Sequence, residues 1–452
     1  MNLNPGLAFT ALRRHHRTLA GIFDQAVVGI GNLAVGLMVL RASTKEEYGL
    51  YSLCYMTLIV LNGFSNALFV AQLTVSYHDR PADLRNAFAA SLLCGQLLFS
   101  VSLALAGLAL AVLLPDSILS PDMRPLLIVA VLACPVVMAH DFVRGYFFLV
   151  ERTTSAIALD LILIVGWFTG TVGLGSGPMP SQSLAALAAF GLAALTSVGL
   201  GLALSRLPLR AGWHSAIGVV ATVWDQGRWA LGGTAITALQ NQGHVYLLGW
   251  LGSAKEIAEL NAARMLMMPM GLVIIGVGRT LVPAMARQAA EGRFAEMRRD
   301  ARLTLVGVLL VIGLYSMVML IGEDVFIARV LGKSYEGIAP LVALWMVILL
   351  LQAIDANLSA VMQVAKRFRE LMLINVWTVV PVLLGVVPMI LLYGAEGNLV
   401  ALAAGYAGIT LLLWRAARRA VADLEKNASA AGQSRDDLVR AGGLPAAGPS
   451  RR

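Results

Sequence analysis

Long apolar segments recur along almost the whole chain, and short charged segments separate them. Tyr48–Tyr77 and Asn86–Pro115 contain no Asp, Glu, Lys or Arg, and each exceeds the roughly 20 residues that a helix needs to cross a bilayer. Leu161–Ser205 is also uncharged but too long for one span, and the turn-forming segment Gly175–Ser183 divides it. The pattern predicts an all-α integral membrane protein of about twelve transmembrane helices, at 19–41, 48–77, 86–115, 125–150, two within 161–205, 229–252, 257–286, 303–330, 338–365, 371–393 and 398–414.

The arginines and lysines between these segments are distributed unevenly over the two sides of the membrane. If the N-terminus is cytoplasmic, the cytoplasmic segments hold 20 of them and the opposite side holds 6. Cytoplasmic loops typically carry this excess, so we expect an even number of spans with both termini in the cytoplasm. Composition agrees, because 58% of the residues are hydrophobic and only 13% are charged, against about 25% charged in soluble domains.

The second half of the chain repeats the pattern of the first. Ser43–Glu46 and Ser253–Glu256 share three of four residues, lie 210 residues apart and each follow the first span of a half. We therefore expect two six-helix lobes, at 19–205 and 229–416, as in transporters built from parallel repeats. Residues 1–18 form a basic cytoplasmic N-terminus, 206–228 a cytoplasmic connector and 417–452 a disordered cytoplasmic tail rich in Ala, Gly, Ser and charge.

The connector carries apolar residues at helical spacing. Trp213, Ile217, Val220 and Trp224 recur on one face, which predicts an amphipathic helix on the inner membrane surface. The alternative is a simple linker.

Charge and cysteine content narrow the possible functions further. The net charge is +8, yet the basic residues sit in scattered clusters without a basic face, so nucleic acid is not an expected partner. Cys54, Cys94 and Cys134 lie inside apolar segments without metal-ligand spacing and are expected to be small buried residues. Neither a phosphate-binding glycine loop nor a nucleophile motif is present, so the chain is not expected to be an enzyme.

Several predicted spans carry polar stripes, which are costly in lipid and therefore tend to face a cavity or another helix. The first span has Gln25, Gly29, Asn32 and Gly36 on one face, and the tenth has Gln352, Asp355, Ser359 and Gln363. For these two long stripes we favour a water-filled cavity. Shorter stripes pair Asn62 with Asn66 and Gln240 with His244, and there hydrogen bonding between helices is the leading alternative.

Four arginines lie within or at the edge of predicted spans. Arg41 ends span one, and Arg144 lies in span four close to His140 and Asp141. Arg264 and Arg279 in span eight are about 22 Å apart along the axis and differ by about 60° in azimuth, so one face can hold both. Pro269 between them is expected to bend the helix. The alternative for each arginine is that its side chain extends to the nearer membrane surface.

Several motifs resemble those of a known family. Phe23–Gln25, Asn32, Leu40–Ala42 and Tyr48–Tyr51 are similar to the first helical hairpin of Wzx-type polysaccharide flippases, and Arg144–Phe148 resembles their fourth helix. These flippases belong to the multidrug/oligosaccharidyl-lipid/polysaccharide (MOP) exporter superfamily. The similarity extends over about residues 15–420, although the second half matches mainly in its pattern of spans. It implies the superfamily fold, in which two lobes rock around a central solvent-filled cavity.

The resemblance also implies a function. Such flippases move undecaprenyl-diphosphate-linked oligosaccharides across the bacterial inner membrane, so the expected partners are this substrate, membrane lipid and the polymerase and export proteins of the same pathway. No cofactor is expected beyond a proton or sodium gradient. The diphosphate and sugar headgroup is expected to meet Arg279, Arg264, Arg41, Arg144, Asn32 and Gln240, because arginine binds phosphate in bidentate fashion. The candidates for ion coupling are Asp24, Asp355 and His140.

Two other functions remain open at this point. A multidrug exporter of the same fold would bind organic cations in an acid-rich lobe, and Asp24, Asp141, Asp160 and Asp355 roughly balance the arginines in number. A membrane glycosyltransferase or polymerase would need large outer loops with catalytic groups, which this sequence lacks. The arginines of span eight argue against the multidrug exporter.

Overall fold

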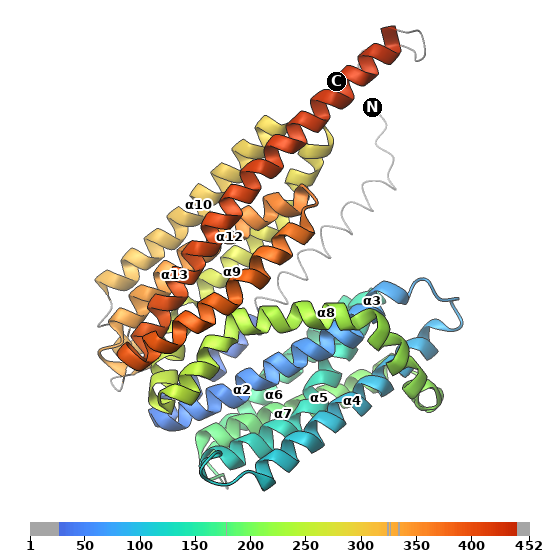
Figure 1. The fold of residues 1–452 in the computed structure, drawn as a ribbon. Coiled ribbons are helices and arrows are strands. Elements are labelled where there is room, and N and C mark those ends of the chain that lie inside the picture. The colour runs from blue at the N-terminus through green and yellow to red at the C-terminus, as the bar shows by residue number, and fades with distance from the viewer. Residues whose placement is uncertain (1–26, 178, 323–324, 326, 333–334, 441–452) are drawn as a thin grey trace. The chain divides into compact units, whose positions relative to one another are not determined.

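The computed structural model describes residues 27–440 apart from 178, 323–324, 326 and 333–334, and within these it describes all side chains except those of 226, 279 and 427–440. Every regular element in this part of the chain is a helix (Figure 1). The prediction of an all-helical fold is therefore confirmed. Gln25 of the first predicted stripe and Asp24, a candidate for ion coupling, lie outside the described residues.

The helices follow one another with short connections. A first helix covers Val27–Ala42. It is followed by α2 (Lys45–Ser65), the π-helix η1 (Asn66–Val70), α3 (Ala71–Ser76), α4 (Arg85–Leu113), α5 (Met123–Leu149), α6 (Thr153–Gly175), α7 (Gln182–Ser205), α8 (Leu209–Leu251), α9 (Ala254–Ala290), α10 (Phe294–Ile321), the π-helix η2 (Ile327–Leu331), α12 (Ala339–Val364) and α13 (Phe368–Arg440).

Nine helical segments among the described residues are long and apolar enough to cross a membrane, and Val27–Ala42 is a shorter apolar helix. Two helices continue across positions where the sequence pattern predicts that one segment ends and the next begins. Helix α8 joins the connector to span seven without a break, and α13 joins spans eleven and twelve across Gly394, whose backbone is non-helical with φ 57°. The chain is thus a multi-pass helical membrane protein. The count of twelve spans and the cytoplasmic position of both termini stay predictions.

The described residues group into two compact units. Unit 1 comprises Met1–Met268, Glu323–Val342 and Val386–Asn398, and unit 2 comprises Pro269–Gly322, Ala343–Gly385 and Leu399–Arg452. Within α9 the division falls at Pro269, the residue that the sequence analysis identifies as a bend. The predicted lobe boundaries at 205 and 229 stay predictions.

Small residues allow the helices of unit 1 to pack closely. Helices α6 and α7 lie side by side, and a Cβ atom on Gly166 or Gly170 would lie only 3.1 or 3.0 Å from the Cβ atoms of Ala193 and Ala189. Two small residues four positions apart on each helix bring the backbones together, as is common between membrane helices. This contact fixes the positions of α6 and α7, which carry part of the site described below.

Unit 2 has its own apolar core, formed by α9, α10, α12 and α13. Met285, Met297 and Met362 are almost fully buried there, against Ala417 and Ala420 of α13. Helix α13 therefore continues beyond residue 417, where the sequence pattern predicts a disordered tail, because this stretch packs against the core. Ion pairs of Asp423 with Arg367 and of Glu425 with Arg298 accompany the packing.

Gly49 of α2 packs closely against the start of α9. A Cβ atom there would lie 1.8 Å from the carbonyl oxygen of Ala254, so Gly49→Ala must separate α2 from α9. We expect this substitution to destabilise the protein by about 1–3 kcal/mol, the usual cost of overpacking, and to lower the thermal unfolding midpoint in detergent. Gly63→Ala is the matched control on the same helix, because its Cβ atom would meet only the Thr234 side chain at 3.5 Å. Equal midpoints for the two variants would contradict this prediction.

Candidate functional site

A chamber of about 250 Å³ lies within unit 1, between helix Val27–Ala42, α2, α6, α8 and α9. One part of its wall is apolar or aromatic, and the other part is polar. The polar wall consists of Asn32, Ser52, Gln242, Asn261 and Arg264, and three methionines, Met56, Met265 and Met268, lie beside it. The chamber thus offers hydrogen-bonding groups and apolar surface to the same occupant, as ligand sites generally do.

The aromatic wall is a continuous stack. Tyr48, Tyr51 and Tyr55 follow one another along one face of α2, and Tyr51 and Tyr55 stack with ring centroids 6.0 Å apart. Tyr55 also stacks on Trp167 of α6 at 5.6 Å, and the Trp167 indole N–H donates to the Ala186 carbonyl at 2.9 Å. Trp167 also packs against Phe190 of α7, with ring centroids 4.5 Å apart, so the stack forms an aromatic side of the chamber.

The polar wall contains a charged group and several amides with unused hydrogen-bonding capacity. Arg264 is the single formally charged residue among the described residues that line the chamber. Asn261 lies one helical turn before it on α9 and is 4% exposed, and neither its Nδ2 nor its Oδ1 has a partner within the described structure. The Oε1 atom of Gln242 is unpartnered as well. This wall therefore carries an arginine and is rich in amide groups.

Polar contacts hold the N-terminal ends of α2 and α9 together beside the chamber. The Lys45 Nζ atom is 2.6 Å from Glu259 Oε1 and lies 5.2 Å from the ring centroid of Tyr335. The Tyr48 hydroxyl donates to the Met265 sulfur at 3.2 Å. Since Lys45 follows span one, these contacts lie on the predicted outer side of the membrane.

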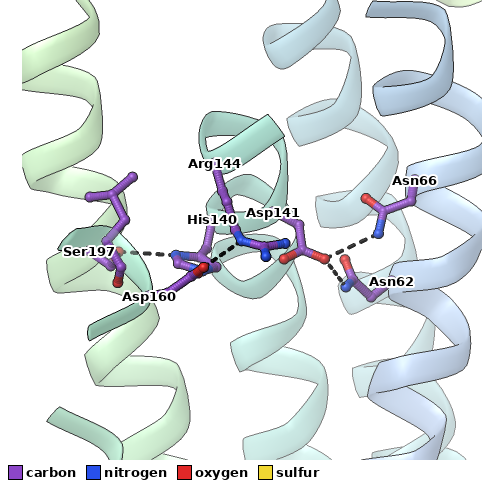
Figure 2. A network of polar contacts seen from close by, with 8 residues as sticks. Asn62, Asn66, His140, Asp141, Arg144, Asp160 and Ser197 are labelled. Carbon is purple, nitrogen blue, oxygen red and sulfur yellow. Dashed lines mark hydrogen bonds and ion pairs between the residues drawn. The ribbon is translucent and has the colours of Figure 1, made fainter. Parts of the chain in front are cut away.

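A second polar cluster connects α5 with α6, α7 and α2 (Figure 2). The Arg144 Nε donates to Asp160 Oδ2 at 2.6 Å, and the Arg144 guanidinium lies between the carboxylates of Asp160 and Asp141. Asp141 Oδ2 accepts hydrogen bonds from Asn62 at 2.5 Å and Asn66 at 3.1 Å. Asn66 opens the π-helix η1, a local irregularity that is frequent at functional sites.

His140 completes this cluster. The Ser197 hydroxyl oxygen lies 3.0 Å from the Leu159 carbonyl oxygen and 3.0 Å from the His140 Nδ1 atom, and its single proton serves only one of these contacts. The other ring nitrogen, Nε2, is 3.2 Å from Asp160 Oδ1. If Ser197 donates to Nδ1, a neutral ring donates its one proton from Nε2 to Asp160; if Ser197 donates to Leu159, Nδ1 donates to Ser197 and the contact with Asp160 needs a second proton. The pair is buried, with both residues 2% exposed, and the two arrangements differ by one proton.

The structure brings together some of the predicted substrate-binding residues and separates others. Asn32 and Arg264 both line the chamber, together with Gly36 of the first stripe. Arg41 lies on the helix of Asn32 but outside the chamber lining, and its Nε donates to the Val330 carbonyl at 2.8 Å. Arg144 belongs to the cluster with Asp160, not to the chamber lining. The α8 amide in the lining is Gln242, two residues after the predicted Gln240.

The other predicted residues lie in unit 2 or outside the described part. The side chain of Arg279 and the whole of Asp24 are not described. In unit 2, Thr410 donates to Asp355 Oδ1 at 2.6 Å, and Gln352 donates to the Tyr406 hydroxyl at 3.0 Å. The tenth-span stripe therefore forms hydrogen bonds between α12 and α13 at these two positions, which is the alternative to the cavity that we favoured from the sequence.

The sequence analysis missed three chamber groups, namely Asn261, Gln242 and the aromatic stack on Tyr55 and Trp167. Asn261 carries a usable signal, because an amide three residues before Arg264 shares its helix face. Trp167 carries no such signal, since its apolar span looks like any lipid-facing helix. Asp160 was counted as an intramembrane acid without its partner His140, which lies on another helix.

Comparisons with solved structures identify the fold. A lipid II flippase, MurJ, in an inward closed conformation, aligns with a TM-score of 0.72 at 12% identity, covering 91% of this chain and 90% of the flippase. An inward-facing multidrug resistance MATE family transporter of the MOP superfamily gives 0.66 at 14% identity, over 88% of this chain and 96% of that one. A MOP superfamily transporter from Pyrococcus furiosus, whose binding pocket is described as reversed in polarity, aligns with a TM-score of 0.59 at 14% identity. The alignment covers 90% of this chain and 95% of that transporter. These relatives are transporters and flippases, not enzymes.

The family is established by the sequence itself. No curated protein sequence matches the chain. Residues 23–289, more than half of its length, match the family described as polysaccharide biosynthesis protein, and this range includes the chamber and the His140 cluster. The chain therefore belongs to the polysaccharide biosynthesis protein family and has the fold shared by the flippases and multidrug transporters of the MOP superfamily.

Proposed function

We propose that the protein flips a prenyl-diphosphate-linked oligosaccharide across the bacterial inner membrane by alternating access. The observation that carries this proposal is the chamber of unit 1, in which Arg264 is the single formal charge among the described lining residues and is surrounded by amides and tyrosines. The family match and the fold shared with a lipid II flippase support a lipid-linked substrate.

The chemistry of this wall suits such a headgroup. A diphosphate carries negative charge that an arginine binds through paired N–H donors. Sugars present hydroxyl groups, which carboxamide side chains such as Asn261 and Asn32 bind well. The prenyl tail needs no protein site, because the lipid itself accommodates it.

The multidrug exporter is the second candidate, supported by the fold shared with MATE transporters. An organic cation needs acidic groups in its site or an accessible aromatic face. The described chamber lining has no acid, and its one formal charge is positive. The aromatic rings stack on one another, so this candidate is the weaker one.

We propose a proton gradient as the driving force, with the His140–Asp160 pair as the coupling site. The two hydrogen-bond arrangements described above differ by one proton. When the pair gives up that proton, the Ser197 hydroxyl turns from the Leu159 carbonyl to the ring nitrogen, and this releases a hydrogen bond between α7 and α6. Proton binding is in this way tied to helix packing in unit 1. Asp355 is the corresponding candidate in unit 2, since its Oδ2 atom is buried without a partner in the described structure.

A proteoliposome assay tests the proposal. Vesicles contain the purified protein and a prenyl-diphosphate-linked sugar in both leaflets, and an impermeant glycosyltransferase labels the sugars of the outer leaflet only. We expect the protein to make nearly all of the sugar available to the enzyme, and protein-free vesicles to leave about half of it unlabelled. Tight binding of cationic dyes together with no increase in labelling would contradict this function and indicate multidrug export.

A further inference from the structure

The repeated motif of the sequence, Ser43–Glu46 and Ser253–Glu256, starts two helices whose first turns meet in unit 1. Helix α2 begins at Lys45, inside the first copy, and α9 begins at Ala254, inside the second copy. Gly49 lies about one turn after the first copy, and a Cβ atom there would be 1.8 Å from the carbonyl oxygen of Ala254. The two copies of the motif therefore bring the backbones of α2 and α9 into contact at the same end.

An ion pair joins α2 to α9 beside this backbone contact. The Lys45 Nζ atom lies 2.6 Å from Glu259 Oε1, and the two side chains are only 16% and 23% exposed. The Tyr335 ring, itself 1% exposed, lies 5.2 Å from the Lys45 Nζ atom and covers it further. Because salt and water screen a partly buried pair much less than a surface pair, this pair helps to hold the two helix ends together.

The chamber lies next to this contact, further along both helices. Tyr48, three residues after Lys45 on α2, lines the chamber, and so does Arg264, five residues after Glu259 on α9. The contact lies on the predicted outer side of the membrane, since Lys45 follows span one. Because the backbones of α2 and α9 touch there, the chamber cannot open between them at its outer end unless the two helices separate.

Both contacts can break without a large loss of apolar burial. Gly49 has no side chain, so separating it from Ala254 exposes backbone atoms only. The side chains of Lys45 and Glu259 are charged and become hydrated when they part, so the pair is held by a small difference between attraction and hydration. Contacts of this kind suit a gate that opens and closes repeatedly, whereas interlocked apolar side chains do not.

We infer that the Lys45–Glu259 pair is the latch of an outer gate, which is formed while the chamber is closed to the outer side and breaks when the chamber opens there. This inference rests on the proposed function, in which the chamber opens to one side of the membrane at a time. Neither residue belongs to the chamber lining, so both act through the helices as positioning residues. Removing either charge should raise the population of the outward-open state.

The test measures how fast a cysteine in the chamber reacts with an impermeant maleimide that is added outside spheroplasts expressing the full-length protein. Ser52→Cys supplies this cysteine, because Ser52 lines the chamber. The native Cys54, Cys94 and Cys134 are at most 1% exposed, and the protein without Ser52→Cys gives the background. We expect Lys45→Met to raise the reaction rate about tenfold, because the loss of one hydrogen bond between charged groups shifts a two-state equilibrium by about this factor.

Further variants show whether the pair itself is responsible. Glu259→Gln should have the same effect as Lys45→Met, and the double variant should react no faster than either single variant, because both changes remove one shared interaction. The charge swap of Lys45→Glu with Glu259→Lys should return the rate close to that of the wild type. Asp116→Asn breaks an ion pair of the predicted outer side that lies outside the chamber lining, and it should leave the rate unchanged.

The outcomes separate this inference from the proposed function. An unchanged rate in both Lys45→Met and Glu259→Gln, or a faster reaction only when the maleimide is added to inside-out vesicles, would show that the pair does not close an outer gate. Additive effects in the double variant would show that the two residues act separately. If the rates follow the expectation while the proteoliposome assay shows no translocation, the latch is supported and the proposed function fails.

Discussion

Arg264→Gln is expected to reduce translocation of a prenyl-diphosphate-linked sugar by about 10- to 100-fold. The substitution removes the single formal charge of the described chamber lining and keeps an amide of similar reach. A hydrogen bond to a charged group contributes about 1.5–3 kcal/mol, and each 1.4 kcal/mol is a factor of ten in affinity. Because the substrate is a multiply charged diphosphate, most of this loss should be in binding. The proteoliposome labelling assay measures it directly.

Two further variants make the result specific. Arg264→Lys keeps the charge but loses the bidentate geometry, so we expect it to retain an intermediate rate. Arg124→Gln removes an arginine of unit 1 that lies outside the chamber lining and pairs with Asp116, and it should leave translocation unchanged. A normal rate for Arg264→Gln, or an equal loss for Arg124→Gln, would show that the chamber does not bind the phosphate.

The length of the apolar segments alone predicts most of the helices. An apolar segment of about 20 residues crosses the lipid, where its backbone N–H and C=O groups must hydrogen-bond to one another and therefore form a helix. The helix ends were less predictable. Helix α8 begins within the connector, at Leu209, and Gly212 there packs so closely against Ala90 of α4 that a Cβ atom would lie 2.7 Å from the Ala90 backbone. The helix past residue 417 depends on Met285 and Met297, which lie far away in the sequence. Such contacts leave no mark in local periodicity.

The site was predictable only as far as a single helix determines it. Helical spacing placed Asn32 and Gly36 on one face, and both line the chamber. Spacing does not tell which helices meet, so the sequence did not connect Trp167 with Tyr55 or His140 with Asp160. It also grouped Arg41 and Arg144 with Arg264 by charge alone, whereas the structure pairs Arg144 with Asp160.

The cluster around His140 leads to the second large effect. Asp160→Asn is expected to abolish the part of translocation that an imposed pH gradient drives, leaving only slow equilibration between the leaflets. The carboxylate accepts from Arg144 and faces the His140 ring, so an amide in its place removes the charge that stabilises the shared proton. The affinity of the chamber for a prenyl-diphosphate-linked sugar should be retained, because Asp160 is not part of the chamber lining. Vesicles with opposite pH gradients measure the driven component.

This prediction needs controls that show that the variants fold and that the coupled ion is the proton. Removing one member of a buried ion pair can cost about 3–5 kcal/mol, and in this pair Asp160 is 2% and Arg144 21% exposed. His140→Gln is the companion variant, since it keeps hydrogen-bonding capacity but cannot hold the second proton. Asp116→Asn, at an exposed ion pair, is the control that should keep full gradient dependence. If Asp160→Asn and His140→Gln both respond to the pH gradient like the wild type, or if only a sodium gradient drives the wild type, the proton does not act at this pair.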